Sequence, residues 1–218
     1  MIAREAFASL PLGTWMIGEA MSTVETRNYT AEDLLAMPDG DRFELVDGEL
    51  VEINVSLLSS WVGGELHGRV REFTRQHDQG MVWPADTGCQ FLPDSPGTVR
   101  KPDVLFVRKN RIPADWQSQG YLRIAPDLTA EVISPHDLAY DVDEKVLEYL
   151  RAGVRLVWVI NPETRTVRVH RGDGSSAWLT ERDVLDGEDV LPGYQCPIHD
   201  LFPPPAAASA ARAGSSAT

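Results

Sequence analysis

The stretch PDLTAEVISPHDLAYDVDEKVLEYLRAGVRLVWVI (residues 126–160) decides the fold class, because its hydrophobic pattern changes twice. Residues 128–133 combine β-branched side chains with alternation, which predicts a strand. Residues 142–151 place apolar side chains three and four positions apart, which predicts a helix. Residues 155–160 are almost uniformly apolar, as is typical of a central strand buried on both faces. The order strand, helix, strand indicates an α/β protein.

Toward the N-terminus the pattern predicts a short helix followed by a β-hairpin. Thr30 and Asp33 form a capping-box-like start for a helix that ends near Met37. The segment RFELVDGELVEI (residues 42–53) has Asp47-Gly48 between two alternating apolar runs, which is the strongest short hairpin signal. The other predicted elements are a helix at 59–76 and strands at 81–91, 103–107, 166–171 and 177–180. Together they predict a central mixed β-sheet flanked by helices.

We expect one domain with two irregular ends. Residues 1–28 show no useful periodicity and are expected to form an irregular extension. Residues 203–218 are a Pro/Ala/Ser tail that is too poor in large apolar groups to pack, so we expect it to be disordered. The domain itself is expected over residues 29–202, which is long enough to bury a core.

Composition excludes several classes of protein. The chain is 43% apolar and 24% charged, which is ordinary for a folded domain, and no apolar run approaches the roughly 20 residues of a membrane span. Cys89 and Cys196 lie far apart, so we expect no disulfide framework and no CxxC metal site. A reducing cytoplasm is the natural location, with Cys89 as a small core residue.

The net charge of −13 argues against a nucleic-acid partner, because proteins that hold DNA usually present a basic patch. Two modest clusters of basic residues are present, and we expect both to be solvated surface. They consist of Arg69, Arg71 and Arg75, and of Arg100, Lys101, Arg108, Lys109 and Arg111.

Three acidic residues stand where strand patterning makes a carboxylate costly. Glu44 interrupts RFELV, Asp103 opens the apolar run of KPDVLFV, and Glu131 lies inside LTAEVIS. A carboxylate buried in a strand needs a partner or a metal ion. Each residue alone could lie on an exposed strand face, but three on successive predicted strands favour a shared site.

The helix after Glu131 carries a fourth anomaly. Asp141 and Glu144 fit a capping box, so we expect this helix to start near Val142. Its apolar stripe is formed by Val142, Val146 and Tyr149. Lys145 falls inside that stripe. The lysine either extends to solvent from the edge of the stripe or points back at the acids of the preceding strand.

Glu44, Asp103 and Glu131 supply hard oxygen ligands suited to Mg²⁺ or Mn²⁺. A lysine beside such an ion can orient a water molecule or offset charge on a phosphate. The chain has no GxxxxGK[ST], GxSxG or HExxH motif, and the spacing of its five histidines makes a zinc site unfavourable. His136 is close enough to Glu131 to reach the rim of the site, but a turn histidine is the preferred interpretation.

Four segments in this order resemble the bacterial restriction endonuclease-like family of the PD-(D/E)XK nuclease superfamily, over residues 29–202. They are RFELVDGELVEI, KPDVLFV, PDLTAEVISP and YDVDEKVLEYLRAGVRLVWVINPETRTVRVH. The resemblance implies a restriction-endonuclease-like core and a Mg²⁺- or Mn²⁺-dependent endonuclease that cleaves DNA, often as a homodimer. It implies Asp103 and Glu131 as metal ligands, with Glu44 as the additional acid. The superfamily's usual lysine position is Ile133 here, so the resemblance assigns the catalytic lysine to Lys145.

One departure from the family pattern keeps two alternatives open. The family often carries a histidine at the start of the helix after the hairpin, where this chain has LLSSW (residues 57–61). The first alternative is a binding or regulatory protein on a nuclease fold that has lost useful turnover. The second is a hydrolase that acts on RNA or another phosphoester.

Overall fold

The computed structural model describes residues 28–118 and 120–204. The predicted irregular extension and the predicted Pro/Ala/Ser tail fall outside these residues, apart from Asn28, Pro203 and Pro204. The boundaries of the 29–202 domain therefore remain a prediction. In the part of the chain that is described, no helix is long and apolar enough to cross a membrane.

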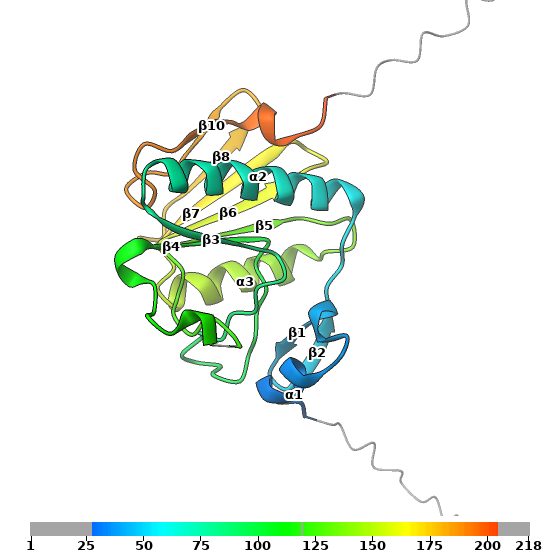
Figure 1. The fold of residues 1–218 in the computed structure, drawn as a ribbon. Coiled ribbons are helices and arrows are strands. Elements are labelled where there is room, and N and C mark those ends of the chain that lie inside the picture. Colours follow the sequence, from blue (N-terminus) through cyan, green and yellow to red (C-terminus); the bar gives the residue numbers. More distant parts are fainter. Residues whose placement is uncertain (1–27, 119, 205–218) are drawn as a thin grey trace, which may run out of the picture.

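A six-stranded mixed sheet forms the centre of the molecule (Figure 1). Its strands lie in the order β3-β4-β5-β6-β7-β8. They are β3 Gly80–Pro84, β4 Val104–Arg108, β5 Leu128–Val132, β6 Leu156–Asn161, β7 Thr166–Arg171 and β8 Ser176–Thr180. β5 and β6 pair in parallel, and the other neighbours in this sheet pair antiparallel. The parallel pair needs a crossover, which the helix between its strands supplies.

One long helix covers each face of the sheet (Figure 1). α2 Leu57–Gln76 buries Val62, Leu66 and Val70 against one face, and α3 Ala139–Arg151 buries Val142 and Val146 against the other. β6 is buried along almost its whole length, as its apolar sequence predicted. On β5, the residues Leu128, Ala130 and Val132 belong to the core on the α2 side. Glu131 alternates with them and therefore faces α3.

A small unit of helix and hairpin precedes the main sheet (Figure 1). α1 Ala31–Ala36 has the predicted capping box between Thr30 and Asp33. β1 Phe43–Val46 and β2 Glu49–Glu52 form the predicted hairpin, and the turn residues Asp47 and Gly48 have φ of 48° and 85°. Positive φ at both turn positions is what a tight hairpin of right-handed twist requires. Leu45 exchanges two backbone hydrogen bonds with Val99, which places β1 beside the segment that enters β4.

The predicted start of α3 is wrong. The helix begins at Ala139, and its N-cap residue is Leu138, whose side chain cannot cap it, so Asp141 and Glu144 do not form a capping box. The reason is a turn after β5 in which the backbone N–H of Ser134 donates to the Asp137 carboxylate. That turn brings the chain into helical geometry three residues earlier than the sequence pattern indicated.

Two other boundaries also differ from the predictions. α2 begins at Leu57 instead of the predicted residue 59, because Ser56 and Ser59 form a capping box. β3 ends at Pro84, so the predicted strand over 81–91 is too long. Cys89 instead forms isolated bridges to Arg100 and Leu122, and it is fully buried, as predicted for a small core residue.

The remaining elements are short and were not predicted. They are β9 Val184–Asp186, β10 Gln195–Pro197, η1 Gly40–Arg42, η2 Lys109–Arg111, η3 Trp116–Ser118 and η4 Ile198–Leu201. β9 and β10 pair with each other in a separate two-stranded sheet. Their apolar residues extend the core on the α2 side of the main sheet.

Candidate active site

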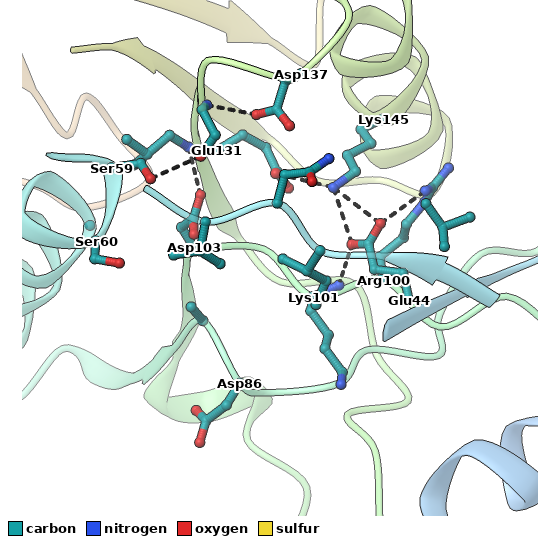
Figure 2. Close-up of a pocket in the computed structure, with 18 of the residues that line it drawn as sticks. Glu44, Ser59, Ser60, Asp86, Arg100, Lys101, Asp103, Glu131, Asp137 and Lys145 are labelled. Carbon is teal, nitrogen blue, oxygen red and sulfur yellow. Dashed lines mark hydrogen bonds and ion pairs between the residues drawn. The ribbon is translucent and has the colours of Figure 1, made fainter. Parts of the chain in front are cut away.

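An open cavity of about 930 Å³ lies where the hairpin, the first half of α2, the start of α3 and the ends of β4 and β5 meet. Its lining includes all four residues that the sequence singled out: Glu44, Asp103, Glu131 and Lys145. Figure 2 shows these side chains converging from different elements. The structure therefore brings the four predicted residues together.

Asp103 and Glu131 are neighbours across two paired strands. The register pairs Val104 with Ala130, so Asp103, one residue before β4, lies opposite Glu131. Asp103 Oδ2 accepts a 2.6 Å hydrogen bond from the backbone N–H of Val132. Glu131 Oε1 accepts a 2.7 Å hydrogen bond from the hydroxyl of Tyr149. Each carboxylate is thus oriented by a short hydrogen bond, one from the backbone of β5 and one from α3.

The pKa of each of these two acids is raised. Burial, and then the negative charge of Glu131, raise the pKa of Asp103 to about 7. Burial also raises the pKa of Glu131, although Lys145 opposes the shift. Two carboxylates that resist ionisation together are stabilised by a cation placed between them. Their electrostatics therefore suit a cation site.

Glu44 is in a different electrostatic state. It accepts hydrogen bonds from the backbone N–H of Lys101 at 2.8 Å and from the guanidinium of Arg100 at 3.1 Å. Lys145 Nζ lies 3.1 Å from Glu44 Oε2. Burial raises the pKa of Glu44, but Lys145 and Arg100 outweigh it and the net pKa is lowered. Glu44 is therefore an ionised, fully paired carboxylate.

Lys145 points into the site and not along the surface. Its side chain is 22% exposed, and Nζ contacts Glu44 and, at 3.5 Å, Glu131 Oε2. Burial lowers the pKa of Lys145, but Glu131 and Glu44 raise it above its ordinary value. The alternative of a lysine that extends to solvent is therefore wrong. The ammonium stays protonated near neutral pH and can donate hydrogen bonds but cannot accept a proton.

The expectation of solvated surface is wrong for two members of the second basic cluster. Arg100 and Lys101 are 5% and 8% exposed and line the cavity. Arg100 binds Glu148 through two 2.8 Å hydrogen bonds as well as contacting Glu44. The Lys101 ammonium donates to the carbonyl of Gly40 at 2.7 Å. Their closeness to Asp103 in an extended segment was the signal available in the sequence.

Glu148 and Tyr149 also contribute to the site, although neither was predicted as a site residue. They lie three and four positions after Lys145, so they share its face of α3. Glu148 pairs with Arg100 and Tyr149 donates to Glu131, so one turn of helix supplies three contacts to the site. Tyr149 was expected only as part of the apolar stripe. Spacing from Lys145 could have identified both.

Serines occupy the place where the family pattern often has a histidine. Ser59 and Ser60 line the cavity near the start of α2, and Ser59 is 2.8 Å from the hydroxyl of Ser134. This contact ties α2 to the turn after β5. His136 is an exposed turn residue that does reach the cavity lining.

The donor set for a metal ion is a pair of acids and not a complete cage. Among the described residues, no group of three or more His, Cys, Asp or Glu side chains is arranged to hold an ion. Mg²⁺ is commonly bound by one or two carboxylates while water and substrate phosphate complete its coordination. The chemistry of Asp103 and Glu131 fits that mode of binding.

The mixed sheet, with a helix on each face and acids at the adjoining ends of β4 and β5, defines the restriction-endonuclease-like α/β fold. The chain belongs to the Uma2 family, whose model is described as "Putative restriction endonuclease" and matches residues 31–199. The crystal structure of "a putative nuclease belonging to DUF820" from Anabaena variabilis is similar, with a TM-score of 0.69 and 21% identity. The alignment covers 80% of this chain and 97% of that one. No curated protein matches the chain.

Proposed function

We propose that this protein is a divalent-metal-dependent endonuclease that hydrolyses phosphodiester bonds in DNA, with Mg²⁺ or Mn²⁺ as its cofactor. The observation that carries the proposal is the pairing of Asp103 and Glu131, two acids with raised pKa values, beside a protonated lysine in an open cavity. Membership of a family described by nuclease activity supports the same reaction class.

Each residue has a distinct role in this proposal. Asp103 and Glu131 would hold the ion. A bound ion of this kind polarises the phosphodiester and lowers the pKa of a water molecule so that it can attack. Lys145 donates hydrogen bonds to a phosphate oxygen and offsets the negative charge that develops there. Because it remains protonated, it does not act as a general base.

The acidic charge of the chain imposes a condition on this function. The cavity lining holds more acidic than basic side chains, and the whole chain carries a net charge of −13. A polyanionic substrate is repelled by such a surface until cations screen it. We therefore expect the divalent ion to be required for nucleic-acid binding as well as for catalysis.

A cleavage assay tests the proposal. The purified full chain is incubated with supercoiled plasmid, single-stranded DNA or RNA in Mg²⁺, Mn²⁺ or EDTA. Cleavage should require the metal, should be abolished by Glu131→Ala and should fall by about 100-fold or more with Lys145→Ala. Glu163→Ala, an exposed turn acid, serves as the matched control and should cleave normally. Cleavage that survives both site substitutions would show that another site or a contaminant is responsible.

A binding or regulatory module is the second candidate. The acidic charge of the chain favours it, together with the serines at the start of α2, where the family often carries a histidine. Calorimetry with Mn²⁺ separates the two candidates. If the chain binds no metal and cleaves no DNA or RNA, the binding module is the better description.

We further propose that the protein acts as a cytoplasmic homodimer. Large apolar side chains are exposed around the start of α2: Val55, Leu57 and Trp61. Exposed apolar patches of this kind mark interaction surfaces. Light scattering after size exclusion should give twice the mass of one chain, and Leu57→Glu should lower it. A single-chain mass at micromolar concentration would contradict the dimer.

A further inference from the structure

The hydrogen-bonding capacity of Glu44 is already used. A carboxylate has about four lone-pair sites. Oε1 of Glu44 accepts from the backbone N–H of Lys101 at 2.8 Å and from Lys145 Nζ at 3.2 Å. Oε2 accepts from Arg100 Nη1 at 3.1 Å and lies 3.1 Å from Lys145 Nζ. The side chain is only 3% exposed, so little of it remains open to a further ligand.

Asp103 and Glu131 are bonded much less completely. From the described part of the chain, Asp103 accepts one hydrogen bond, to Oδ2, from the backbone of Val132. Glu131 accepts a short bond from Tyr149 at Oε1, and within residues 28–118 and 120–204 its Oε2 has only the long 3.5 Å contact with Lys145. Asp103 and Glu131 therefore keep carboxylate lone pairs that can bind an ion, whereas Glu44 does not.

Arg100 prevents Glu44 from turning toward the ion. Its side chain is 6% exposed, and its guanidinium is anchored by two 2.8 Å bonds to Glu148 on α3. Such a planar two-bond arrangement sets the orientation of an arginine, and here it aims the remaining Nη1 at Glu44. Moving Glu44 would leave a buried guanidinium partly unpaired, which is costly.

The formal charges also separate Glu44 from the pair Asp103 and Glu131. Glu44 and Glu148 together balance Arg100 and Lys145, which leaves these four residues neutral as a group. The two negative charges of Asp103 and Glu131 remain, and one divalent cation matches them. Charge and hydrogen bonding thus separate a pair of potential ligands from a group that is already complete.

The geometry points to a positioning role for Glu44: it is not a metal ligand, and Arg100 and the Lys101 backbone hold it so that it aims Lys145 into the site. The inference rests on the proposed metal site and restricts its ligands to Asp103 and Glu131. Glu148, through Arg100, belongs to the same chain of contacts. Lys145 is the member that touches substrate.

The first experiment counts the water molecules on bound Mn²⁺. Substituting even an outer partner of a metal site weakens binding by roughly 10–100-fold, so affinity alone does not identify a ligand. Water-proton relaxation does, because a lost ligand is replaced by water. In the full chain, Glu44→Ala should leave the number of waters unchanged, whereas Glu131→Ala, which removes both ligand oxygens, should raise it by about one. A rise with Glu44→Ala would overturn the inference.

The second experiment tests whether Glu44 acts through Lys145. In a double-mutant cycle, Glu44→Gln should slow plasmid cleavage by about tenfold when Lys145 is present and by less than about twofold in a Lys145→Met background. Equal, additive losses in the two backgrounds would overturn the positioning role. A structural effect that does not act through Lys145 would also give additive losses.

Arg100→Lys provides a second test of the inference in case the Glu44 variants do not fold. It keeps the charge but loses the two-bond anchor on Glu148, so cleavage should slow while the water count stays at the wild-type value. A higher water count would overturn the inference. If the wild-type chain binds no Mn²⁺, both the metal-dependent nuclease and this inference fail. If the wild-type chain binds Mn²⁺ and Glu44→Ala gains a water on the ion, only the inference fails.

Discussion

Arg100→Met removes the cation that joins β1 to α3 without removing much side-chain volume. Arg100 makes three hydrogen bonds to two carboxylates, Glu44 and Glu148, and is almost fully buried. Its loss leaves Glu44 with Lys145 and the Lys101 backbone, while Glu148 loses its partner. Removing one partner of a buried ion pair costs about 3–5 kcal/mol. Glu148 is partly exposed, so we expect the lower end, about 3 kcal/mol.

Urea unfolding of the metal-free protein, followed by tryptophan fluorescence, measures this loss. The matched control is Arg69→Met, because Arg69 bridges Glu65 and Asp200 but is 36% exposed and should cost less than about 1 kcal/mol. The low pKa of Glu44 means that its stabilising effect is present above the ordinary glutamate value of about 4.3 and is lost as pH falls below it. The Arg100→Met deficit should therefore shrink in acid. Equal deficits for the two arginines near pH 7 would refute the reasoning.

Three further predictions concern the site. Lys145→Met should lower cleavage by about 100-fold or more, because a preorganised donor to the phosphate is lost, while the number of water molecules on bound Mn²⁺, measured by water-proton relaxation, stays at the wild-type value; a higher water count would contradict its assignment. Metal binding should release protons near pH 7, because the ion binds ionised Asp103, whose pKa is about 7, and affinity should rise with pH through that value; calorimetry in buffers of different ionisation enthalpy measures this, and no proton release at pH 6 to 7 would contradict it. Mn²⁺ at 100 times its dissociation constant should stabilise the fold by about 2.7 kcal/mol, and Asp103→Asn should reduce this gain in a thermal melt; an undiminished gain would place the ion elsewhere.

Local sequence patterns predicted most of the secondary structure. The hairpin followed from Asp47-Gly48, α1 from its capping box, and β6 from a uniformly apolar run. These signals work because turn geometry, helix capping and strand burial depend on residues close together in the chain. Boundaries set by contacts from elsewhere were missed. β3 ends at Pro84 because the chain then turns, and Cys89 pairs with Arg100 and Leu122.

The candidate site shows the same division. Glu44, Asp103, Glu131 and Lys145 were identifiable because each breaks the apolar pattern of its own element, and a broken pattern is visible in sequence. Their different states were not identifiable. A carboxylate that is saturated with donors and one that is free to bind an ion look the same in sequence.

The sequence by itself determined which segments become strands and helices, and which polar side chains are forced toward the core. Only the tertiary structure decided that Arg100 is buried between Glu44 and Glu148 and that Tyr149 donates to Glu131. The reason is physical. Burial and pairing of a charge depend on elements far apart in sequence, here β1, the entry to β4, and α3, and no local pattern records which of them meet.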